Sequence, residues 1–369
     1  MLFHSQIFVF GFLPLCLLGF HLAGRWALHW VLVASLTFYG WWNPIHIPLL
    51  VGSILANHAI GRRIQQSRIP RYWLLGGVAG NLAVLGWFKY ADFLIGIVAP
   101  EAPAFGIALP LAISFFTFQQ IVFLADCRDP ALPAPSLLHY AAFVAFFPHS
   151  IAGPLVRPRD IIPQMAWMSD TRLTAENLSA GLTLFLLGLA KKLVLADLFG
   201  GFADTGFDAA ARLETLTLLE AWAATLSYAL QIYFDFSAYS DMATGLARIF
   251  GVRFPLNFDS PYQAADIADF WRRWHISLGA FFRDHVYIPL GGNRHRAAFN
   301  LMATMLLAGL WHGAAWRFVL WGGLHGAMLV THRFYRRIAP PLPQPLGQAV
   351  TTVLVCLAWV PFRADGMAA

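Results

Sequence analysis

The sequence is poor in charged residues. Only 12% of its 369 residues are Asp, Glu, Lys or Arg, whereas 58% are hydrophobic. A soluble domain carries roughly 25% charged residues, so this composition excludes a water-soluble surface. Apolar runs close to the roughly 20 residues that cross a bilayer recur along the whole chain. The composition therefore predicts an all-α polytopic membrane protein, because helices satisfy their own backbone hydrogen bonds in lipid.

Cysteine is also scarce, and a cleavable secretion signal is missing. The three cysteines, Cys16, Cys127 and Cys356, are far apart in the sequence. Their spacing therefore indicates neither a disulfide framework nor a zinc site. The first apolar run, residues 7–22, lacks the basic start and the small-residue cleavage site of a signal peptide. We expect this run to be a retained membrane span and the N-terminus to be mature.

The charge that is present is mainly basic and occurs in clusters. The formal net charge is +6, and four arginines, Arg62, Arg63, Arg68 and Arg71, lie in one loop between early spans. Such clusters are typical of the cytoplasmic ends of spans. We therefore predict that residues 62–71 are cytoplasmic and that the N-terminus lies outside. Basic charge of this kind indicates contact with membrane lipids and implies no nucleic-acid partner.

Eleven segments are candidates for transmembrane or re-entrant helices. They cover roughly residues 5–22, 26–42, 45–60, 72–99, 108–126, 138–152, 177–197, 215–234, 299–311, 314–331 and 346–361. The segment from Phe236 to Arg296 is too polar to cross the membrane as a simple helix. Charged backbone at membrane depth persists only inside protein or beside a wet cavity. We expect this segment to form re-entrant or interfacial helices around an internal space.

The stretch GLWHGAAWRFVLWGGLHG, residues 309–326, places His312 and His325 among apolar residues. On one straight helix their separation of 13 residues in the sequence would put the two rings about 20 Å apart, so we expect no shared metal site. His312 is the better candidate for a reactive group, because Gly313 permits close approach of a ligand. Its neighbours Trp311 and Trp316 should favour the neutral imidazole. The alternative is a packed histidine bonded to a backbone carbonyl.

A second polar cluster follows Asp269 in the stretch DFWRRWHISL. Asp269 is spaced to pair with Arg272 at i+3 and with Arg273 at i+4, which predicts a structural ion pair. His275 follows directly. The cluster is also compatible with an ordinary amphipathic helix at the membrane surface.

A third cluster occurs in QIYFDFSAYSDMATG, residues 231–245. Ser237 and Asp241 share one helical face, and Asp235 precedes them. Carboxylates in such apolar surroundings need partners. They could orient a histidine, bond an arginine of the second cluster, or satisfy one another.

Taken together, these clusters resemble the membrane-bound O-acyltransferase (MBOAT) family, in particular its bacterial branch similar to alginate O-acetyltransferases. The resemblance covers nearly the whole chain. Its motifs are LPLAISFFTFQQ (109–120), FFPHSIAGPLVRP (146–158), YFDFSAYSDMA (233–243), FWRRWHISLGAFFRDHVYIPLGGNR (270–294), GLWHGAAWRFVLWGGLHG (309–326) and VPFRA (360–364).

The resemblance implies which residues form the site. The catalytic histidine of the family's WHG motif corresponds to His312, and a second active-site residue, in the RWHIS motif, corresponds to His275. Other positions are candidates for the substrate tunnel. These are Asp235, Ser237, Asp241, Trp311, Trp316 and His325.

The resemblance also implies the architecture. It predicts one MBOAT membrane domain over residues 1–369, with N-terminal helices at 1–60 and the family core at 108–334. About 10–11 transmembrane or re-entrant helices would surround a central funnel. Relatives usually continue beyond the position of Ala369 with further membrane helices, so we expect the chain to be C-terminally truncated.

The function implied by the resemblance is acetyl transfer across a bacterial inner membrane. The donor would be a cytoplasmic thioester, acetyl-CoA, with no bound cofactor and no metal. The acceptor would be an exported polysaccharide such as alginate, reached directly or through an extracytoplasmic polysaccharide acetyltransferase partner. Three alternatives stay open: a D-alanyl transferase of the same family, a transporter that uses the same histidines and aspartates, and an inactive scaffold.

Overall fold

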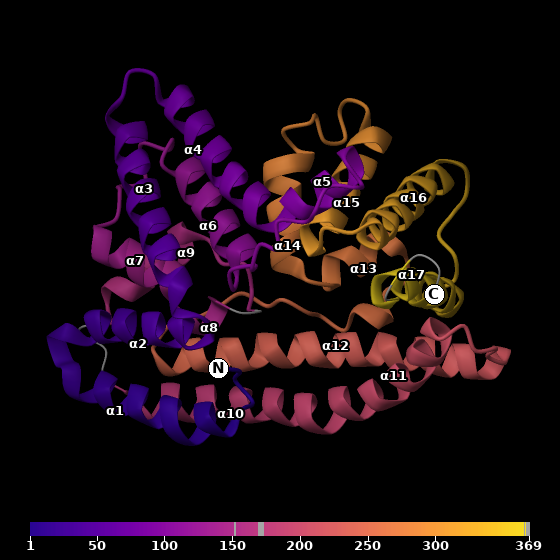
Figure 1. Cartoon of the computed structure of the whole chain (residues 1–369), viewed down its shortest axis with the longest axis horizontal. Coiled ribbons are helices and arrows are strands. Elements are labelled where there is room, and N and C mark those ends of the chain that lie inside the picture. Colours follow the sequence, from indigo (N-terminus) through magenta and orange to yellow (C-terminus); the bar gives the residue numbers. More distant parts are fainter. Residues whose placement is uncertain (151–152, 169–172, 365, 367–369) are drawn as a thin grey trace. The chain divides into compact units, whose positions relative to one another are not determined.

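The chain folds entirely into helices in its described part. A computed structural model describes residues 1–150, 153–168, 173–364 and 366. Within these ranges every regular element is a helix, which confirms the predicted all-α class (Figure 1). Ile151 and Ala152 of the motif at 146–158, and Ala369, where we expect the truncation, lie outside the described residues.

Two compact units share the chain. Unit 1 comprises residues 1–189 and 239–255, and unit 2 comprises residues 190–238 and 256–369. The helix α12 (Leu218–Ile249) runs from unit 2 into unit 1.

Unit 1 contains the N-terminal helices and the helices of the 109–158 motifs. Its elements are η1 (Ile7–Phe12), α1 (Leu13–Ala23), η2 (Gly24–Trp26), α2 (Ala27–Trp42), η3 (Pro44–His46), α3 (Ile47–Gln66), α4 (Pro70–Leu85), η4 (Gly86–Tyr90), α5 (Ala91–Val98), α6 (Ile113–Asp126), α7 (Leu137–Ala145), α8 (Phe147–Ser150), α9 (Pro158–Ala166) and α10 (Ala175–Ala190), the last residue of which already belongs to unit 2. Proline occupies the first turn of α3, α4 and α9, where its missing N–H breaks no helical hydrogen bond.

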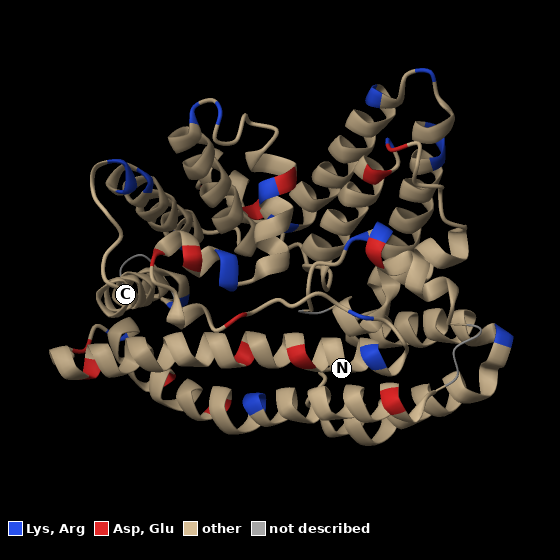
Figure 2. Ribbon diagram, turned by 180° about the vertical axis from the view of Figure 1, so that it is seen from behind, with Lys and Arg blue, Asp and Glu red and all other residues tan. Residues whose placement is uncertain are grey.

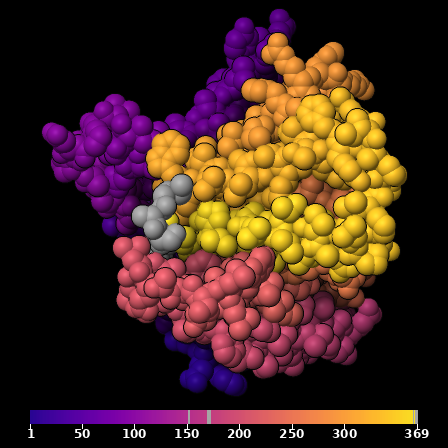
Figure 3. Space-filling view, turned by 90° about the vertical axis from the view of Figure 1, so that its right-hand side faces the viewer, coloured from indigo at the N-terminus to yellow at the C-terminus, as the bar shows by residue number. Residues whose placement is uncertain are grey.

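Unit 2 contains the motifs at 270–294, 309–326 and 360–364, together with residues 233–238 of the motif at 233–243. Its elements are η5 (Lys191–Ala196), α11 (Asp197–Ala211), the first part of α12, η6 (Pro261–Gln263), α13 (Ile267–Arg273), α14 (Ile276–Phe282), η7 (Arg283–Tyr287), α15 (Ala297–His312), α16 (Trp316–Ile338) and α17 (Gln344–Arg363). Its core is rich in aromatic rings, among them Phe270, Trp274, Trp321 and Trp359. On the face shown in Figure 3, α17 packs along α16.

Several helices are apolar and long enough to cross a membrane. Within the described residues, four stretches meet both conditions: Ile7–Trp42, Pro44–Gln66, Pro70–Val98 and Gln344–Arg363. Two shorter apolar helices are Ile113–Asp126 and Ala297–His312. These stretches support the predicted polytopic architecture.

Helices α15 and α16 form a tight antiparallel hairpin in unit 2. The chain leaves the helix at Gly313, which is extended, and α16 begins at Trp316. A Cβ atom at Gly309 would collide with the carbonyl oxygen of Phe318, and one at Gly322 would collide with that of Met305. Glycine at these two positions therefore lets the two backbones touch.

The open end of this hairpin is basic. Arg294 and Arg296 precede α15, and Arg333, Arg336 and Arg337 lie in the last turns of α16. Figure 2 shows this basic charge at the ends of the two helices that are remote from their turn. The hairpin therefore separates a basic end from the end that carries His312.

The polar segment from Phe236 to Arg296 differs in part from the expectation. Its first part does not form re-entrant structure, because α12 continues without a break to Ile249. Its remainder consists of short helices and turns. Asp235, which directly precedes this segment, is paired with a lysine: its Oδ1 lies 2.7 Å from Nζ of Lys192. An ion pair of this kind allows a carboxylate to sit in an apolar helix.

Candidate active site

His312 lies at the closed end of the hairpin, as the last residue of α15. Its ring is half-buried and contacts aromatic rings on three sides. The ring centroids of Trp311, Trp321 and Phe362 lie 4.9, 5.0 and 5.1 Å from that of His312. The turn and these rings fix the position of the imidazole.

A cavity of about 330 Å³ reaches His312. One wall is a single face of α15, formed by Leu301, Thr304, Met305, Ala308 and His312, whose spacing of three and four residues is that of one helical face. From Leu301 to His312 this wall is about 16 Å long. The cavity therefore follows α15 from near the basic end of the hairpin to the histidine.

The other walls carry positive charge and no carboxylate among the described lining residues. Helices α13 and α14 and element η7 contribute Trp271, Arg272, Ile276, Arg283 and Tyr287, among others. Arg272 bonds Asp269 and Arg283 bonds Asp284, so both guanidinium groups are held in place.

The basic end of the cavity has a further polar cluster. The hydroxyl of Tyr287 donates to Oδ1 of Asn293 at 2.8 Å, and Nη1 of Arg333 donates to the same oxygen at 2.7 Å. Tyr287 lines the cavity, so this cluster joins the cavity wall to the basic end of α16. Anionic groups of a ligand would be favoured at this end.

His275 is buried beside the cavity without lining it. It lies between α13 and α14 with φ at +43°, a left-handed conformation that turns the chain sharply. Its side chain is 1% exposed. Its ring centroid lies 6.1 Å from that of Trp311, the neighbour of His312. The structure therefore brings His275 and His312 to the same end of α15.

A single asparagine sets the tautomer of His275. Nδ1 of His275 lies 3.2 Å from Oδ1 of Asn257, and the same oxygen accepts from the backbone N–H and the hydroxyl of Ser277. Because that oxygen is an acceptor, Nδ1 carries the proton and Nε2 has a free lone pair. Burial, with a smaller contribution from nearby His312, holds the pKa of His275 well below its usual range.

His325 lies much closer to His312 than the straight helix predicts. The expected separation of about 20 Å is wrong, because the chain reverses between the two residues. The ring of Trp321 lies between them, with its centroid 5.0 Å from His312 and 4.8 Å from His325. His325 is fully buried, and neither ring nitrogen has a hydrogen-bond partner among the described residues. It packs against Phe270, Trp271 and Trp359.

The polar residues of α12 lie apart from the cavity wall. Asp235 pairs with Lys192, which also lies 2.7 Å from Asp197. This pair was not predicted from the sequence, although a lysine inside an apolar run indicates a partner of opposite charge. Ser237 is buried and donates to the carbonyl of Phe234 at 3.4 Å.

The remaining tunnel candidates have different surroundings. Asp241 belongs to the part of α12 that lies in unit 1. Trp311 is buried between His275 and His312, whereas Trp316 is exposed at the start of α16. None of these three residues lines the cavity.

Asp269 anchors the helix that precedes His275. Its Oδ1 lies 3.3 Å from Nη2 of Arg272, and its Oδ2 lies 3.0 Å from Nε of Arg273, as the spacing predicts. Burial alone would raise the pKa of Asp269, but hydrogen bonding and attraction by Arg273 outweigh it and hold this pKa below its usual range. Asp266 accepts from the backbone N–H of Asp269 at 2.7 Å and so begins the helix.

Metal chemistry finds no support in the described part of the chain. No group of three or more His, Cys, Asp or Glu side chains there is arranged to hold a metal ion.

Comparison with known proteins places these residues in a wider context. The profile of "MBOAT, membrane-bound O-acyltransferase family" matches residues 112–358, which include both His275 and His312. A peptidoglycan O-acetyltransferase of Helicobacter pylori is 41% identical over 100% of this chain and 78% of its own length. A probable alginate O-acetylase of Pseudomonas aeruginosa is 41% identical over 100% of this chain and 73% of its own length. A teichoic acid D-alanyltransferase of Bacillus subtilis is 28% identical over 71% of this chain and 68% of its own length.

Proposed function

The chain belongs to the membrane-bound O-acyltransferase family, and on this premise we propose that it moves an acetyl group from a cytoplasmic thioester toward the hydroxyl groups of an exported glycan polymer. The names of the relatives at 41% identity, one for alginate and one for peptidoglycan, support acetyl as the group and a glycan as the acceptor. The D-alanyltransferases are less similar and match a smaller share of the chain. Acetyl transfer is therefore favoured over D-alanyl transfer.

The observation that carries this proposal is the cavity that follows α15 to His312. Its outer part lies near the basic end of the hairpin, and basic ends are typical of the cytoplasmic side. Arg272 and Arg283 in its wall suit the phosphates of acetyl-CoA, because guanidinium groups bind phosphate through charge-assisted hydrogen bonds. Acetyl-CoA would be a substrate that enters and leaves.

His312 would act as the general base. It would take the proton from the acceptor hydroxyl while that oxygen attacks the thioester carbonyl carbon. The tetrahedral intermediate would then collapse with cleavage of the carbon–sulfur bond, and the thiolate would leave as a thiol with the proton from His312. A positioned base of this kind contributes a factor of about 10²–10⁴ in rate.

His275 would act as a positioning residue. Asn257 holds its proton on Nδ1, so that Nε2 is an acceptor next to Trp311 and His312. Such an acceptor can orient a hydroxyl or a protonated ring for proton transfer.

The proposed location of the protein is the bacterial inner membrane. An extracytoplasmic acetyltransferase partner would receive the acetyl group where the polymer is out of reach.

The test compares His312→Gln with the unchanged full-length protein in proteoliposomes that contain acetyl-CoA and the glycan acceptor. We expect the variant to insert at normal abundance and to lose about 10²–10⁴-fold in thioester turnover. His21→Gln, a change at an exposed histidine of α1, serves as the matched control and should keep full turnover. Normal turnover by His312→Gln would exclude the catalytic role, and polymer transport without acetyl-CoA consumption would support a transporter instead.

A further inference from the structure

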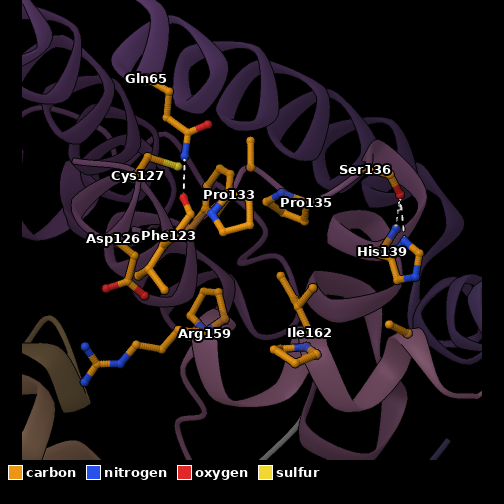
Figure 4. A pocket seen from close by; sticks show the side chains of 15 residues that line it. Gln65, Phe123, Asp126, Cys127, Pro133, Pro135, Ser136, His139, Arg159 and Ile162 are labelled. Atoms are coloured by element: carbon orange, nitrogen blue, oxygen red, sulfur yellow. Dashed lines mark hydrogen bonds between the residues drawn. The ribbon is translucent and has the colours of Figure 1, made fainter. Parts of the chain in front are cut away.

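Unit 1 contains a second pocket, which is unrelated to His312. Its volume is about 300 Å³. It is formed by the ends of α3 and α6, the loop at 127–136, the start of α7 and one face of α9 (Figure 4). Its lining residues are Gln65, Phe123, Asp126, Cys127, Leu132, Pro133, Ala134, Pro135, Ser136, His139, Pro158, Arg159, Ile162, Pro163 and Ala166.

The pocket lies beside the end of a candidate membrane span. Gln65 is the penultimate residue of the candidate span Pro44–Gln66. Nε2 of Gln65 donates to the carbonyl of Leu132 at 2.7 Å, which ties the pocket loop to the end of that span. The end of a span marks the boundary between hydrocarbon and head groups. A ligand in this pocket can therefore have its tail in lipid and its polar part in water.

The middle of the pocket is apolar and rigid. Four of its lining residues are prolines, whose fixed φ angles limit how far the walls can move. Ile162 and Ala166 present one face of α9 to it, and Phe123 adds an aromatic ring from α6. Preformed apolar walls of this kind suit methylene groups, and binding costs little reorganisation.

Two opposite charges stand at one end of the pocket. Asp126 and Arg159 lie there, opposite Ser136 and His139, as Figure 4 shows. Oδ2 of Asp126 is buried and has no hydrogen-bond partner among the described residues. Nε of Arg159 lies 3.9 Å from Oδ1 of Asp160, a loose pair between exposed side chains of the kind that contributes little. Arg159 and Arg157 attract this carboxylate, but its buried Oδ2 accepts no hydrogen bond from the described residues, so a ligand with a cationic N–H donor would satisfy it.

The other end of the pocket has no Asp, Glu, Lys or Arg side chain among its described lining residues. Oγ of Ser136 lies 2.7 Å from Nδ1 of His139. The pocket therefore has one end with a carboxylate and a guanidinium, an apolar middle, and an end with no free charge. This order matches a single amphiphile with a zwitterionic head.

We propose that this pocket binds a phospholipid whose head group carries a primary ammonium and a phosphate, as in phosphatidylethanolamine. The ammonium pairs with Asp126, the phosphate accepts from Arg159, and part of one acyl chain lies between α9 and the proline-rich loop. A purely anionic head group would bring no cationic N–H donor to Oδ2 of Asp126. A choline head group brings charge but no N–H donor for the carboxylate.

Photocrosslinking of the full chain in nanodiscs tests this proposal. The bilayer is phosphatidylcholine with a trace of either phosphatidylethanolamine or phosphatidylglycerol, both with the same diazirine-bearing acyl chain. After illumination, labelled peptides are identified by mass spectrometry. We expect phosphatidylethanolamine to label peptides that contain Phe123 and Ile162 about tenfold more than phosphatidylglycerol, a ratio that corresponds to about 1.4 kcal/mol.

Two variants separate the pocket from the general lipid surface. Ala166→Trp fills the pocket and should abolish this labelling, whereas Ala79→Trp, on an exposed face of α4, should leave it unchanged. Asp126→Asn keeps the shape and should reduce phosphatidylethanolamine labelling to the level of phosphatidylglycerol. Equal labelling by both lipids, or labelling that survives Ala166→Trp, would overturn the proposal. Absence of any lipid label in the pocket would also overturn it and would favour a protein segment as the occupant.

Discussion

Among the single residues, the two histidines of the hairpin have different surroundings. His312 is half-buried at a cavity wall, whereas His325 is fully enclosed by aromatic rings. An enclosed imidazole contributes mainly by filling space, and a residue at a cavity wall can meet a substrate. Substitutions at the two positions should therefore have different consequences.

We predict that His325→Ala lowers the amount of folded protein in the membrane. The change leaves a void among Phe270, Trp271, Trp321 and Trp359, and voids of this size cost about 2–4 kcal/mol. Thermal unfolding in detergent measures the effect, and His325→Phe, which refills most of the volume, should restore part of it. Full stability of His325→Ala together with lost turnover would show that the ring takes part in the reaction.

Acidification should destabilise the protein through His275. Burial holds the pKa of His275 well below its usual value of about 6.5. Below that pH the unfolded chain therefore binds a proton at this position, whereas the folded chain does not. The contribution of His275 to the free energy of unfolding is therefore constant above about pH 6.5. Below that pH the free energy of unfolding falls by about 1.4 kcal/mol per pH unit for one proton.

The measurement is the unfolding midpoint at pH 7.5 and at pH 5.5. His275→Asn removes the titrating ring and places a residue that tolerates a positive φ, so its loss on acidification should be smaller by about one proton. Identical losses in both proteins would show that other groups account for the pH dependence.

Some contacts of the candidate site can be predicted from the sequence, and others cannot. The pairs of Asp269 follow from spacing along one helix, and they are present. The pair of Asp235 with Lys192 joins residues far apart in sequence, and no local rule predicts which lysine meets which carboxylate. The predicted distance between His312 and His325 is wrong because it assumes one straight helix across the break between the predicted spans 299–311 and 314–331.

At the scale of elements, the hairpin of α15 and α16 depends on glycines that allow backbone contact. We predict that Gly322→Ala forces the helices apart, because its Cβ would collide with the carbonyl oxygen of Met305. Overpacking of this kind costs about 1–3 kcal/mol.

The neighbouring residue provides a matched control for this change. At Gly323 an added Cβ would meet its nearest atom, in Leu306, at 3.8 Å, an ordinary contact distance. Gly323→Ala should therefore be tolerated, whereas Gly322→Ala should reduce both the yield of folded protein and the turnover. If both variants behaved alike, close contact of the two backbones would not be what holds the hairpin.

Helix boundaries were harder to predict than helices. The predicted span 138–152 is interrupted, because the backbone leaves the helix at Phe146 just before Pro148. The predicted span 215–234 proved too short, since α12 reaches Ile249. Hydrophobicity sets the expected end of a span, but an ion pair or a proline decides where the helix ends.

For the whole molecule, the basic ends of helices set the expected orientation. Residues 62–71, predicted as one loop, comprise the end of the candidate span Pro44–Gln66, a short connection at 67–69 and the start of α4, and we predict that they are cytoplasmic. A cysteine introduced as Ser67→Cys should react with an impermeant thiol reagent only after the membrane is opened. Reaction in intact cells would reverse the assignment. The native cysteines are buried, so background labelling should be low.

The course of α12 has a consequence for biosynthesis. Its residues up to Ala238 belong to unit 2 and those from Tyr239 belong to unit 1, so the chain leaves unit 1, builds part of unit 2 and then returns. On the ribosome, the first 189 residues emerge without the segment at 239–255 that completes their unit. Domains usually fold as contiguous units while the chain is being made. Unit 1 must instead wait, with a packing surface uncovered, until the ribosome has passed residue 255, and a stall before that point leaves neither unit able to close.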